Sequence, residues 1–300
     1  MNHMQGQVCL VTGANAGIGK QTARELAQMG ATVVLVARNR ERGEAARAEI
    51  AASGASVELL LADFSSPASI RAMTEAFKAR HDRLDVLVNN AGVYLMKREE
   101  TADGLEMTFA VNHLGYFMTT LLLWDRLLAA RSARVIVLAS DAHRQAKLNF
   151  DDLQNRRKYA GFRVYAQSKL ANVLFTYELD RRRGNAPITI NAVHPGFVAS
   201  NFGRNNGGVA GLFMTRIVPL FARTVVEGAA TSVYLASSPE VAGISGQYFT
   251  DSRAVKSAPQ SYDRATAERL WAISEELTGL RLPNLALPDE RRENGHQTDL

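Results

Sequence analysis

The fold of this 300-residue chain is decided by the stretch Val8-Cys9-Leu10-Val11-Thr12-Gly13-Ala14-Asn15-Ala16-Gly17-Ile18-Gly19. Its apolar first part, 8–11, predicts a short buried strand that runs directly into three closely spaced glycines. Helical spacing of apolar residues follows and stops at Gly30, which is typical of the C-terminal end of a helix. Glycines between a strand and a helix let the backbone approach a pyrophosphate at the helix N-terminus. The stretch therefore predicts a dinucleotide-binding turn; the alternative is a tight turn without a ligand.

Strands and helices continue to alternate along the chain. Further strands are predicted at 32–37, 57–61, 84–88, 135–138, 188–193 and 246–249, and helices at 40–53, from about 67, and at 105–128, 158–183, 227–236 and 261–277. A strand, a crossover helix and a strand repeated this regularly predict an α/β fold, a Rossmann-type doubly wound parallel sheet with helices on both faces. We find no internal repeat, low-complexity region or linker, so residues 1–285 are expected to form a single domain.

Two stretches depart from this pattern. Residues 197–222 lose periodicity and contain several glycines, which predicts a lid or substrate loop. The apolar section of this loop, 209–221, fits two interpretations, the wall of a greasy pocket or a contact with a neighbouring subunit. Residues 286–300 form a polar tail that is expected to be disordered.

Composition narrows the class of protein. At 46% hydrophobic and 22% charged residues, the chain is ordinary for a soluble globular protein. The formal charge of +5 is scattered along the chain, which argues against nucleic acid as a partner. Cys9 is the single cysteine, so no internal disulfide forms, and the six histidines lack the spacing of metal ligands. No apolar run reaches the ~18 residues of a membrane span, and we expect a cytoplasmic protein without a metal.

A candidate catalytic pair lies in the run Tyr165-Ala-Gln-Ser-Lys169-Leu-Ala-Asn-Val-Leu-Phe175. Tyr165 and Lys169 are four residues apart in a predicted helix, so both side chains leave the same face. An ammonium group near a phenol favours the phenolate, so Lys169 is expected to lower the Tyr165 pKa from its usual value of about 10. The pair is then suited to exchanging protons near neutral pH. The alternative is a surface lysine beside a half-buried aromatic residue.

Polar and glycine-rich segments follow the predicted strands, at the edge of a parallel sheet where ligands bind. Arg38 comes directly after the second strand, where dinucleotide folds carry a reader of the ribose. An arginine there, with no carboxylate before it, favours the 2′-phosphate of NADP(H) over NAD(H), although it also fits the solvated start of the helix at 40–53. The other strand-end segments are Asp63-Phe64, Asn89-Asn90-Ala91-Gly92, Ser140 and His194-Pro195-Gly196.

Together these motifs resemble a known family. The spaced set Thr12-Gly13-xxx-Gly17-x-Gly19, Asn89-Asn90-Ala91-Gly92, Asn112, Ser140, Tyr165-xxx-Lys169 and Pro195-Gly196 resembles the classical short-chain dehydrogenases/reductases. The segment 165–175, with Ala142-His143 and Leu148-Asn-Phe-Asp-Asp-Leu153, is similar to the branch that contains the retinol dehydrogenases and WW-domain oxidoreductase. The chain differs from that branch because it shows no N-terminal membrane anchor and no WW modules, and has Ala139 where a second serine is usual.

The resemblance implies a role for each motif residue. Tyr165 would exchange a proton with the substrate oxygen, Ser140 would hold and polarise that oxygen, and Lys169 would lower the Tyr165 pKa and bind the nicotinamide ribose. Asn112 would hold a helix distortion and a water in a proton path. The implied cofactor site, from the pyrophosphate turn to the adenine, ribose and nicotinamide contacts, consists of Gly13, Asn15, Ala16, Gly17, Ile18, Gly19, Arg38, Asp63, Phe64, Asn90, Ala91, Gly92, Tyr165, Lys169, Pro195, Gly196, Val198 and Ser200.

The activity that the resemblance implies is NADP(H)-dependent transfer of a hydride between nicotinamide and a carbonyl or alcohol. The substrate is expected to be lipophilic, such as a retinoid, a steroid or a fatty aldehyde, because the predicted lid has many apolar residues. The resemblance also implies a homodimer or homotetramer formed through the helices at 105–128 and 158–183. The alternative is an NADP(H)-binding redox sensor or scaffold with little turnover. A serine hydrolase is disfavoured because the chain has no G-x-S-x-G elbow.

Overall fold

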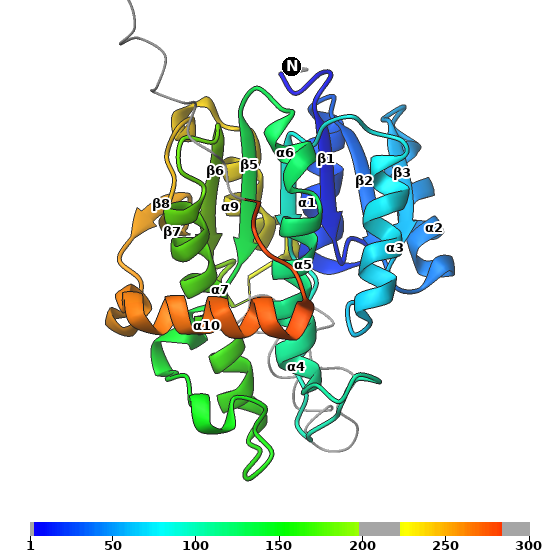
Figure 1. The fold of residues 1–300 in the computed structure, drawn as a ribbon. Helices are drawn as coiled ribbons and strands as arrows, with labels where there is room; N and C mark the ends of the chain where they lie inside the picture. The colour runs from blue at the N-terminus through cyan, green and yellow to red at the C-terminus, as the bar shows by residue number, and fades with distance from the viewer. Residues whose placement is uncertain (1–2, 198–222, 284–300) are drawn as a thin grey trace, which may run out of the picture.

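The computed structural model describes residues 3–197 and 223–283. The predicted tail at 286–300, and all of the predicted lid except Phe197, lie outside these residues. Within the described ranges, no helix is both long and apolar enough to cross a membrane. One sheet runs through the middle of the described chain, and helices lie on both sides of it (Figure 1).

The sheet has eight strands in the order β3-β2-β1-β4-β5-β6-β7-β8. Their bounds are β1 Val8–Thr12, β2 Thr32–Ala37, β3 Val57–Leu61, β4 Val86–Asn89, β5 Ala133–Leu138, β6 Ile188–Val193, β7 Gln247–Thr250 and β8 Arg253–Val255. All neighbours from β3 to β7 pair in parallel, and β8 alone among the described strands runs antiparallel. The predicted α/β fold with a doubly wound parallel sheet is therefore confirmed.

The edge strand β8 is not predicted from the sequence. It is joined to β7 through Asp251 and Ser252, which both have positive φ, at 50° and 57°. Glycine and asparagine adopt this conformation most readily, and they mark most two-residue hairpin turns. Because the turn contains neither glycine nor asparagine, the sequence shows no hairpin signal at that point.

Helices cover both faces of the sheet. The described α-helices of five or more residues are α1 Gly17–Gln28, α2 Arg40–Ala51, α3 Pro67–Lys78, α5 Gly115–Leu122, α6 Trp124–Leu128, α7 Gly161–Arg182, α9 Val225–Ser237 and α10 Arg264–Thr278. Short turns are α4 Met107–Phe109, the π-helical η1 Ala110–Leu114, and the 3₁₀ turns η2 Asp141–Gln145, η3 Phe150–Asp152, η5 Pro239–Val241 and η6 Pro259–Tyr262. One buried apolar cluster joins a sheet face to α3, α5, α7 and α10, and a second joins the opposite face to α1, α2 and α9.

The predicted helix at 105–128 is interrupted in the structure. It consists of α4, η1, α5 and α6, and the π-helical turn η1 carries Asn112. A π turn adds one residue to a helical turn and is often found at functional sites. The interruption follows a tertiary contact, because the buried Asn112 side chain hydrogen-bonds the backbone of Val93. Helical periodicity alone does not show such a contact.

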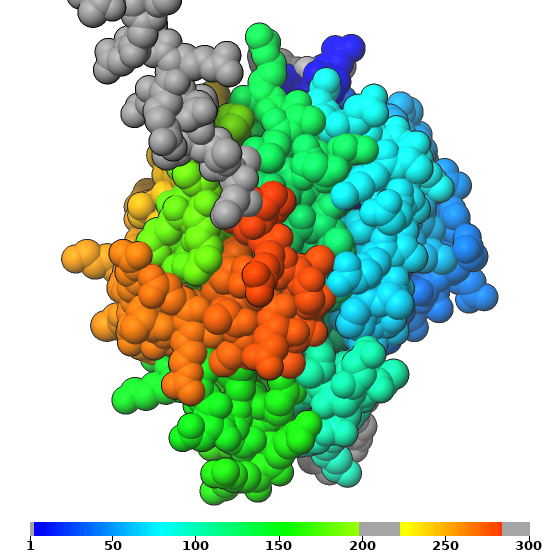
Figure 2. Space-filling view, viewed as in Figure 1, coloured from blue at the N-terminus to red at the C-terminus, as the bar shows by residue number. Residues whose placement is uncertain are grey.

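Helix α10 lies across α5 and α7 on the outside of the molecule (Figures 1 and 2). Trp271 is 2% exposed, and its ring centroid lies 5.0 Å from that of Phe117 and 6.0 Å from that of Phe175. The guanidinium of Arg182 lies 4.7 Å from the Trp271 ring centroid. α10 therefore covers part of the helix surface through which the resemblance implied a dimer. The homodimer or homotetramer itself stays a prediction.

We predict that Trp271→Ala lowers the free energy of unfolding by about 3–5 kcal/mol, because truncating a buried aromatic side chain leaves a cavity. Leu277→Ala on the same helix is the control, since Leu277 is 37% exposed. The control should cost no more than about 1 kcal/mol. Urea unfolding followed by circular dichroism gives both values, and equal losses would contradict the packing of α10 described above.

Candidate active site

The carboxyl ends of the parallel strands bring the predicted site residues to one edge of the sheet. Gly13 follows β1, Arg38 follows β2, Asp63 follows β3, Asn90 follows β4, Ser140 follows β5 and Pro195 follows β6. The chain changes direction across the sheet between β1 and β4, which are neighbours although β2 and β3 separate them in sequence. Such a switch point is where open α/β sheets bind their ligands.

One buried hydroxyl joins the two strands at this switch point. Thr12 Oγ1 donates to the Val88 carbonyl at 3.3 Å. It accepts from the backbone N–H groups of Asn90 and Ala91 at 2.8 and 2.9 Å. The Asn90 side-chain amide donates to the Thr12 carbonyl at 2.7 Å. Asn90 is predicted to contact the adenosine ribose, and in addition it ties the end of β4 to the glycine turn.

The turn after β1 has no room for a side chain at Gly13 or Gly19. Gly13 and Gly17 have positive φ, at 66° and 56°. A Cβ at Gly13 would lie 2.9 Å from the Cα of Ala91, and one at Gly19 would overlap the Asn90 amide. These positions require glycine because a side chain would be strained or would push β1 and β4 apart.

The helix that follows, α1, begins without a side-chain cap. Its N-cap Ala16 makes no side-chain hydrogen bond, whereas side chains cap α2, α3, α9 and α10. The first N–H groups of α1, at the positive end of the helix dipole, are therefore available to an anion. The backbone of 13–19, which includes Asn15 and Ile18, thus fits the pyrophosphate of a nicotinamide dinucleotide.

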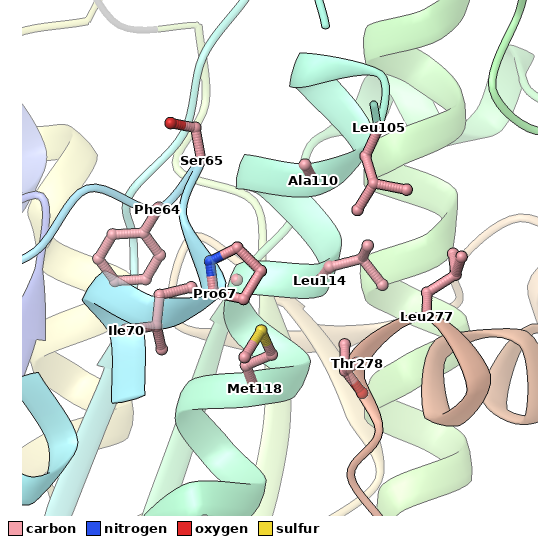
Figure 3. Close-up of a pocket in the computed structure, with 11 residues that line it drawn as sticks. Phe64, Ser65, Pro67, Ile70, Leu105, Ala110, Leu114, Met118, Leu277 and Thr278 are labelled. Atoms are coloured by element: carbon pink, nitrogen blue, oxygen red, sulfur yellow. The ribbon is translucent and has the colours of Figure 1, made fainter. Parts of the chain in front are cut away.

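The two residues predicted to border the adenine, Asp63 and Phe64, have different surroundings. The Asp63 carboxylate accepts from the Ser65 N–H at 2.9 Å and from the Ser65 hydroxyl at 2.7 Å, at the end of β3. Phe64 is only 8% exposed and lines a small apolar cavity among α3, α5 and α10 (Figure 3). A Cβ at Gly115 would lie 2.7 Å from the Phe64 ring. The Phe64 ring is thus buried in the apolar core rather than exposed at the ligand edge. The contact of Phe64 with the adenine stays a prediction.

Arg38 is exposed directly after β2, and it forms no ion pair with another residue of 3–197 or 223–283. The helix beyond it is capped by Asn39, whose side chain accepts from the Arg42 N–H at 2.8 Å. Arg38 therefore lies outside α2, with its guanidinium available to a ligand at the sheet edge.

Three of the four predicted catalytic side chains, Ser140, Tyr165 and Lys169, lie together between β5 and α7. The Ser140 hydroxyl shares a hydrogen bond with the Tyr165 phenol. Lys169 Nζ donates to the Leu138 carbonyl at 2.9 Å. The same Nζ lies 5.6 Å from the ring centroid of Tyr165 and 5.8 Å from that of Tyr116. Aromatic faces near an amine stabilise its charged form, which partly offsets its removal from water.

The acidities of this pair differ from the prediction. Burial raises the pKa of Tyr165 to about 12, although the hydrogen bond with Ser140 acts in the opposite direction. Burial also lowers the pKa of Lys169 to about 7, so the amine is only partly protonated at neutral pH. The predicted lowering of the Tyr165 pKa is therefore wrong for this structure. The physical reason is that removal from water disfavours the charged forms of both groups.

Asn112 connects the π turn η1 to helix α7, which carries Tyr165 and Lys169. Its Nδ2 donates to the Val93 carbonyl and to Ser168 Oγ, both at 3.0 Å, and its Oδ1 accepts from the Val93 N–H at 2.8 Å. Ser168 Oγ donates to the carbonyl of Tyr165 at 2.7 Å. The helix distortion that the resemblance implies at Asn112 is present, and the water in a proton path stays a prediction.

The remaining predicted cofactor contacts lie at the ends of β4 and β6. A Cβ at Gly92, next to Ala91, would lie 3.3 Å from the Oδ1 of Asn112. Pro195 and Gly196 follow β6, and Gly196 has a positive φ of 80°. Val198 and Ser200 lie outside the described residues.

Several residues around the site are not found by sequence reasoning. The Tyr94 ring lies edge-on to the Tyr165 ring, with centroids 5.5 Å apart and an interplanar angle of 81°. Asn172 Nδ2 donates to the Leu138 carbonyl at 3.1 Å, so this oxygen accepts from Asn172 and Lys169 together. Of these residues, only Asn172 could have been found from the sequence, because it follows Lys169 by three residues on one helix and so lies on the same face. The other contacts depend on the tertiary fold.

Comparisons with known proteins point to one family of enzymes. A family model described as short chain dehydrogenase matches residues 7–207. Human retinol dehydrogenase 12 is 42% identical over 93% of this chain and 88% of its own length, and human retinol dehydrogenase 14 is 41% identical over 92% and 88%. A crystal structure of an uncharacterised protein from Mycobacterium paratuberculosis has a TM-score of 0.76 and 32% identity, over 93% of this chain and 96% of that chain. A short chain dehydrogenase from Burkholderia cenocepacia in complex with NADP has a TM-score of 0.67 and 28% identity, over 83% and 97%.

The fold and the strand-edge site define an oxidoreductase that uses a nicotinamide cofactor. The chain belongs to the short-chain dehydrogenase family. Within that family it resembles the retinol dehydrogenases, as the motif comparison predicts.

The lowered pKa of Lys169 makes a prediction about stability. Its pKa is about 7 in the folded chain and 10.5 for a free lysine, so between these values the unfolded state binds more protons. The contribution of Lys169 to the free energy of unfolding therefore rises as the pH rises from 7 to 10, and it is lost as the pH falls back to 7. We expect the free energy of unfolding of the parent, relative to Lys169→Met, to rise by up to about 1.4 kcal/mol per pH unit.

Chemical denaturation of both proteins at several pH values, without added cofactor, measures this difference. Lys158→Met is the control because Lys158 is exposed at the surface. The control should follow the parent at every pH. Parallel stability curves for the parent and Lys169→Met would show that Lys169 keeps an ordinary pKa.

Proposed function

We propose that this protein is an NADP(H)-dependent oxidoreductase that interconverts a lipophilic carbonyl compound and its alcohol, with Tyr165 as the general acid and base. The observation that carries the proposal is the group of Tyr165, Ser140 and Lys169 at the ligand edge of the sheet. A reduced nicotinamide, when bound, supplies the hydride. The protein has to position the carbonyl, stabilise the developing oxyanion and deliver a proton.

Tyr165 is suited to the proton-donating role in reduction. With a pKa of about 12, its phenol keeps its proton across the physiological range. Addition of hydride to a carbonyl develops an alkoxide, which is more basic than a phenolate, so the proton moves downhill from Tyr165. The raised pKa thus favours reduction, in which the tyrosine begins protonated.

Ser140 is oriented to assist this step. Its Oγ already accepts from the Ala142 N–H at 3.2 Å. The hydroxyl proton of Ser140 is therefore left to be donated, toward Tyr165 at rest and toward the substrate oxygen in the reaction. Lys169, with a pKa of about 7, can take up or release a proton near neutral pH. We propose that it helps to reprotonate Tyr165, with Asn112 and a water in the same path.

The surroundings of Tyr165 support a lipophilic substrate. The Tyr94 ring lies against Tyr165, and Met96, in the same loop, is 48% exposed. Phe162, one turn before Tyr165 on α7, is 49% exposed. The similarity to proteins named retinol dehydrogenase 12 and retinol dehydrogenase 14 also supports a lipophilic substrate. We therefore propose a retinoid, a steroid or a fatty aldehyde as the class of substrate.

We propose NADP(H) as the preferred cofactor because Arg38 stands exposed where the ribose of a dinucleotide is read. The complex of the Burkholderia cenocepacia relative with NADP supports this choice. We also propose a cytoplasmic location, since the chain has a single cysteine. The proposed homodimer or homotetramer would form through the parts of 105–128 and 158–183 that α10 does not cover.

An NADP(H)-binding redox sensor or scaffold with little turnover is the alternative function. Consumption of NADPH with a panel of lipophilic aldehydes and ketones distinguishes the two. We expect turnover with at least one compound of the panel. Tight NADPH binding, measured by calorimetry, with no turnover on any compound would favour the sensor.

We predict that Tyr165→Phe lowers kcat by about two orders of magnitude or more, because loss of a general acid typically has this effect. The dissociation constant for NADPH should stay within a few-fold of the parent value. Tyr177→Phe is the control, since Tyr177 lies on the same helix with its hydroxyl bonded to Ser257. Turnover of Tyr165→Phe at nearly the parental rate would rule out Tyr165 as the acid.

We predict that Arg38→Asp lowers kcat/KM for NADPH about tenfold to a hundredfold and leaves NADH unchanged or improved. A charge-assisted hydrogen bond to phosphate contributes roughly 1.5–3 kcal/mol, which corresponds to this range. Arg131→Asp is the control, because it makes the same charge change at the opposite edge of the sheet, ahead of β5. If the parent itself binds NADH as tightly as NADPH, Arg38 does not read a phosphate.

A further inference from the structure

His143 is a buried residue that the proposed function does not use. It lies in η2, three residues after Ser140, and none of its surface is exposed. Its Nδ1 contacts the Ser140 carbonyl at 2.6 Å, and its Nε2 contacts the Ala258 N–H at 3.0 Å. We propose that His143 is a positioning residue, which acts through the Ser140 backbone to hold the Ser140 hydroxyl at the substrate oxygen. This inference rests on the proposed function.

The two partners determine which nitrogen of the ring carries the proton. A backbone N–H can only donate, so the Nε2 that faces Ala258 is the unprotonated nitrogen. The proton therefore lies on Nδ1, which donates to the Ser140 carbonyl. Burial lowers the pKa of His143, and the neutral ring is the form that both contacts require. His143 is thus a fixed hydrogen-bond donor toward Ser140.

Ser140 is held at both its carbonyl and its hydroxyl. The carbonyl accepts from the His143 backbone N–H at 3.0 Å as well as from the ring. The hydroxyl oxygen accepts from the Ala142 N–H. The residue before it, Ala139, is still held to β6 by a hydrogen bond of 2.8 Å to Val193. Ser140 is therefore the first residue beyond the backbone hydrogen bonds that join β5 and β6, and η2 fixes the orientation of its side chain.

His143 also anchors this turn to a distant part of the chain. Its ring centroid lies 4.9 Å from that of Tyr248 in β7. Gln260 Nε2 donates to the carbonyls of His143 and Ala146 at 3.3 and 2.9 Å. The segment at 258–260 thus supports η2 from outside, and His143 transmits that support to Ser140. A shift of about 1 Å at a reacting group is enough to slow an enzyme strongly.

A buried histidine that satisfies two backbone groups can have a purely structural role. The two roles are separable because they use different nitrogens. The contact of Nε2 with Ala258 anchors the turn, whereas the contact of Nδ1 with Ser140 sets the hydroxyl. A side chain that keeps only one of these contacts therefore distinguishes positioning from anchoring.

Three substitutions make this separation. His143→Asn places an amide N–H near the position of Nδ1, and His143→Gln places an amide oxygen near that of Nε2. His143→Phe keeps a ring and loses both contacts. With NADPH and a carbonyl substrate, we expect kcat of His143→Asn within about threefold of the parent, and kcat of the other two lowered about tenfold or more. The KM for NADPH should not change in any of them, because the glycine turn is untouched.

A purely structural role would give a different order. Activity would then follow thermal stability, and His143→Gln, which keeps the anchor to Ala258, would be at least as active as His143→Asn. That order, or equal kcat in the two variants, would overturn the proposal. All rates are compared at a temperature where circular dichroism shows each variant folded.

Two further measurements do not depend on turnover. The ¹⁵N shifts of the His143 ring should show the Nδ1–H tautomer in the parent. Hydrogen exchange of the Ala142 amide, which donates to Ser140 Oγ, should be faster in His143→Gln and His143→Phe than in His143→Asn. An Nε2–H tautomer, or equal exchange in all three variants, would overturn the positioning of Ser140. If the parent reduces no carbonyl compound, the proposed function fails, while these two results still decide the role of His143.

Discussion

The arrangement of the site depends on the buried hydroxyl of Thr12 at the junction of β1 and β4. It donates one hydrogen bond and accepts two, so it pairs backbone groups that two diverging strand ends would otherwise leave unsatisfied. Asn90 adds a second tie to the same turn. The glycine turn and the β4 edge are therefore held at one separation. The strands that carry Arg38 and Ser140 extend outward from this pair on opposite sides, so both halves of the site are placed relative to it.

The part of the site that holds Lys169 and Tyr165 shows how strongly removal from water changes the pKa values of buried groups. Burial raises the pKa of Tyr165 and lowers the pKa of Lys169, so the neutral forms of both groups are favoured. The amine is held by the Leu138 carbonyl rather than by a counter-ion. This carbonyl also binds Asn172, so one backbone oxygen at the end of β5 orients two side chains of α7. The result is a protonated phenol beside an amine that titrates near neutral pH, which suits proton delivery in reduction.

Most of the sheet could be predicted from the sequence because its strands are short apolar runs between clear helical segments. The predictions were wrong or incomplete where a tertiary contact changed a local preference. The helix at 105–128 is interrupted because Asn112 binds the backbone of Val93, and the β7–β8 turn at Asp251 lacks the usual glycine signal. Phe64 stands in a strand-end position typical of a ligand contact, and the sequence did not show that its apolar ring packs in the core against α5.

The sequence by itself determined the order of strands and helices, the need for glycine in the turn after β1, and the pairing of Tyr165 with Lys169 on one helix. These features follow from the local spacing of residues, which is a property of the sequence and does not depend on tertiary contacts. Only the tertiary structure decided the acidity of that pair, the covering of α5 and α7 by α10, and the anchoring of His143 to Ala258. Acidity depends on how much water the surrounding elements exclude. The packing of α10 on α5 and the anchoring of the His143 ring depend on contacts between residues more than a hundred positions apart, such as Phe117 with Trp271 and His143 with Ala258. Local sequence patterns show neither how much water is excluded from a site nor which distant segments come into contact.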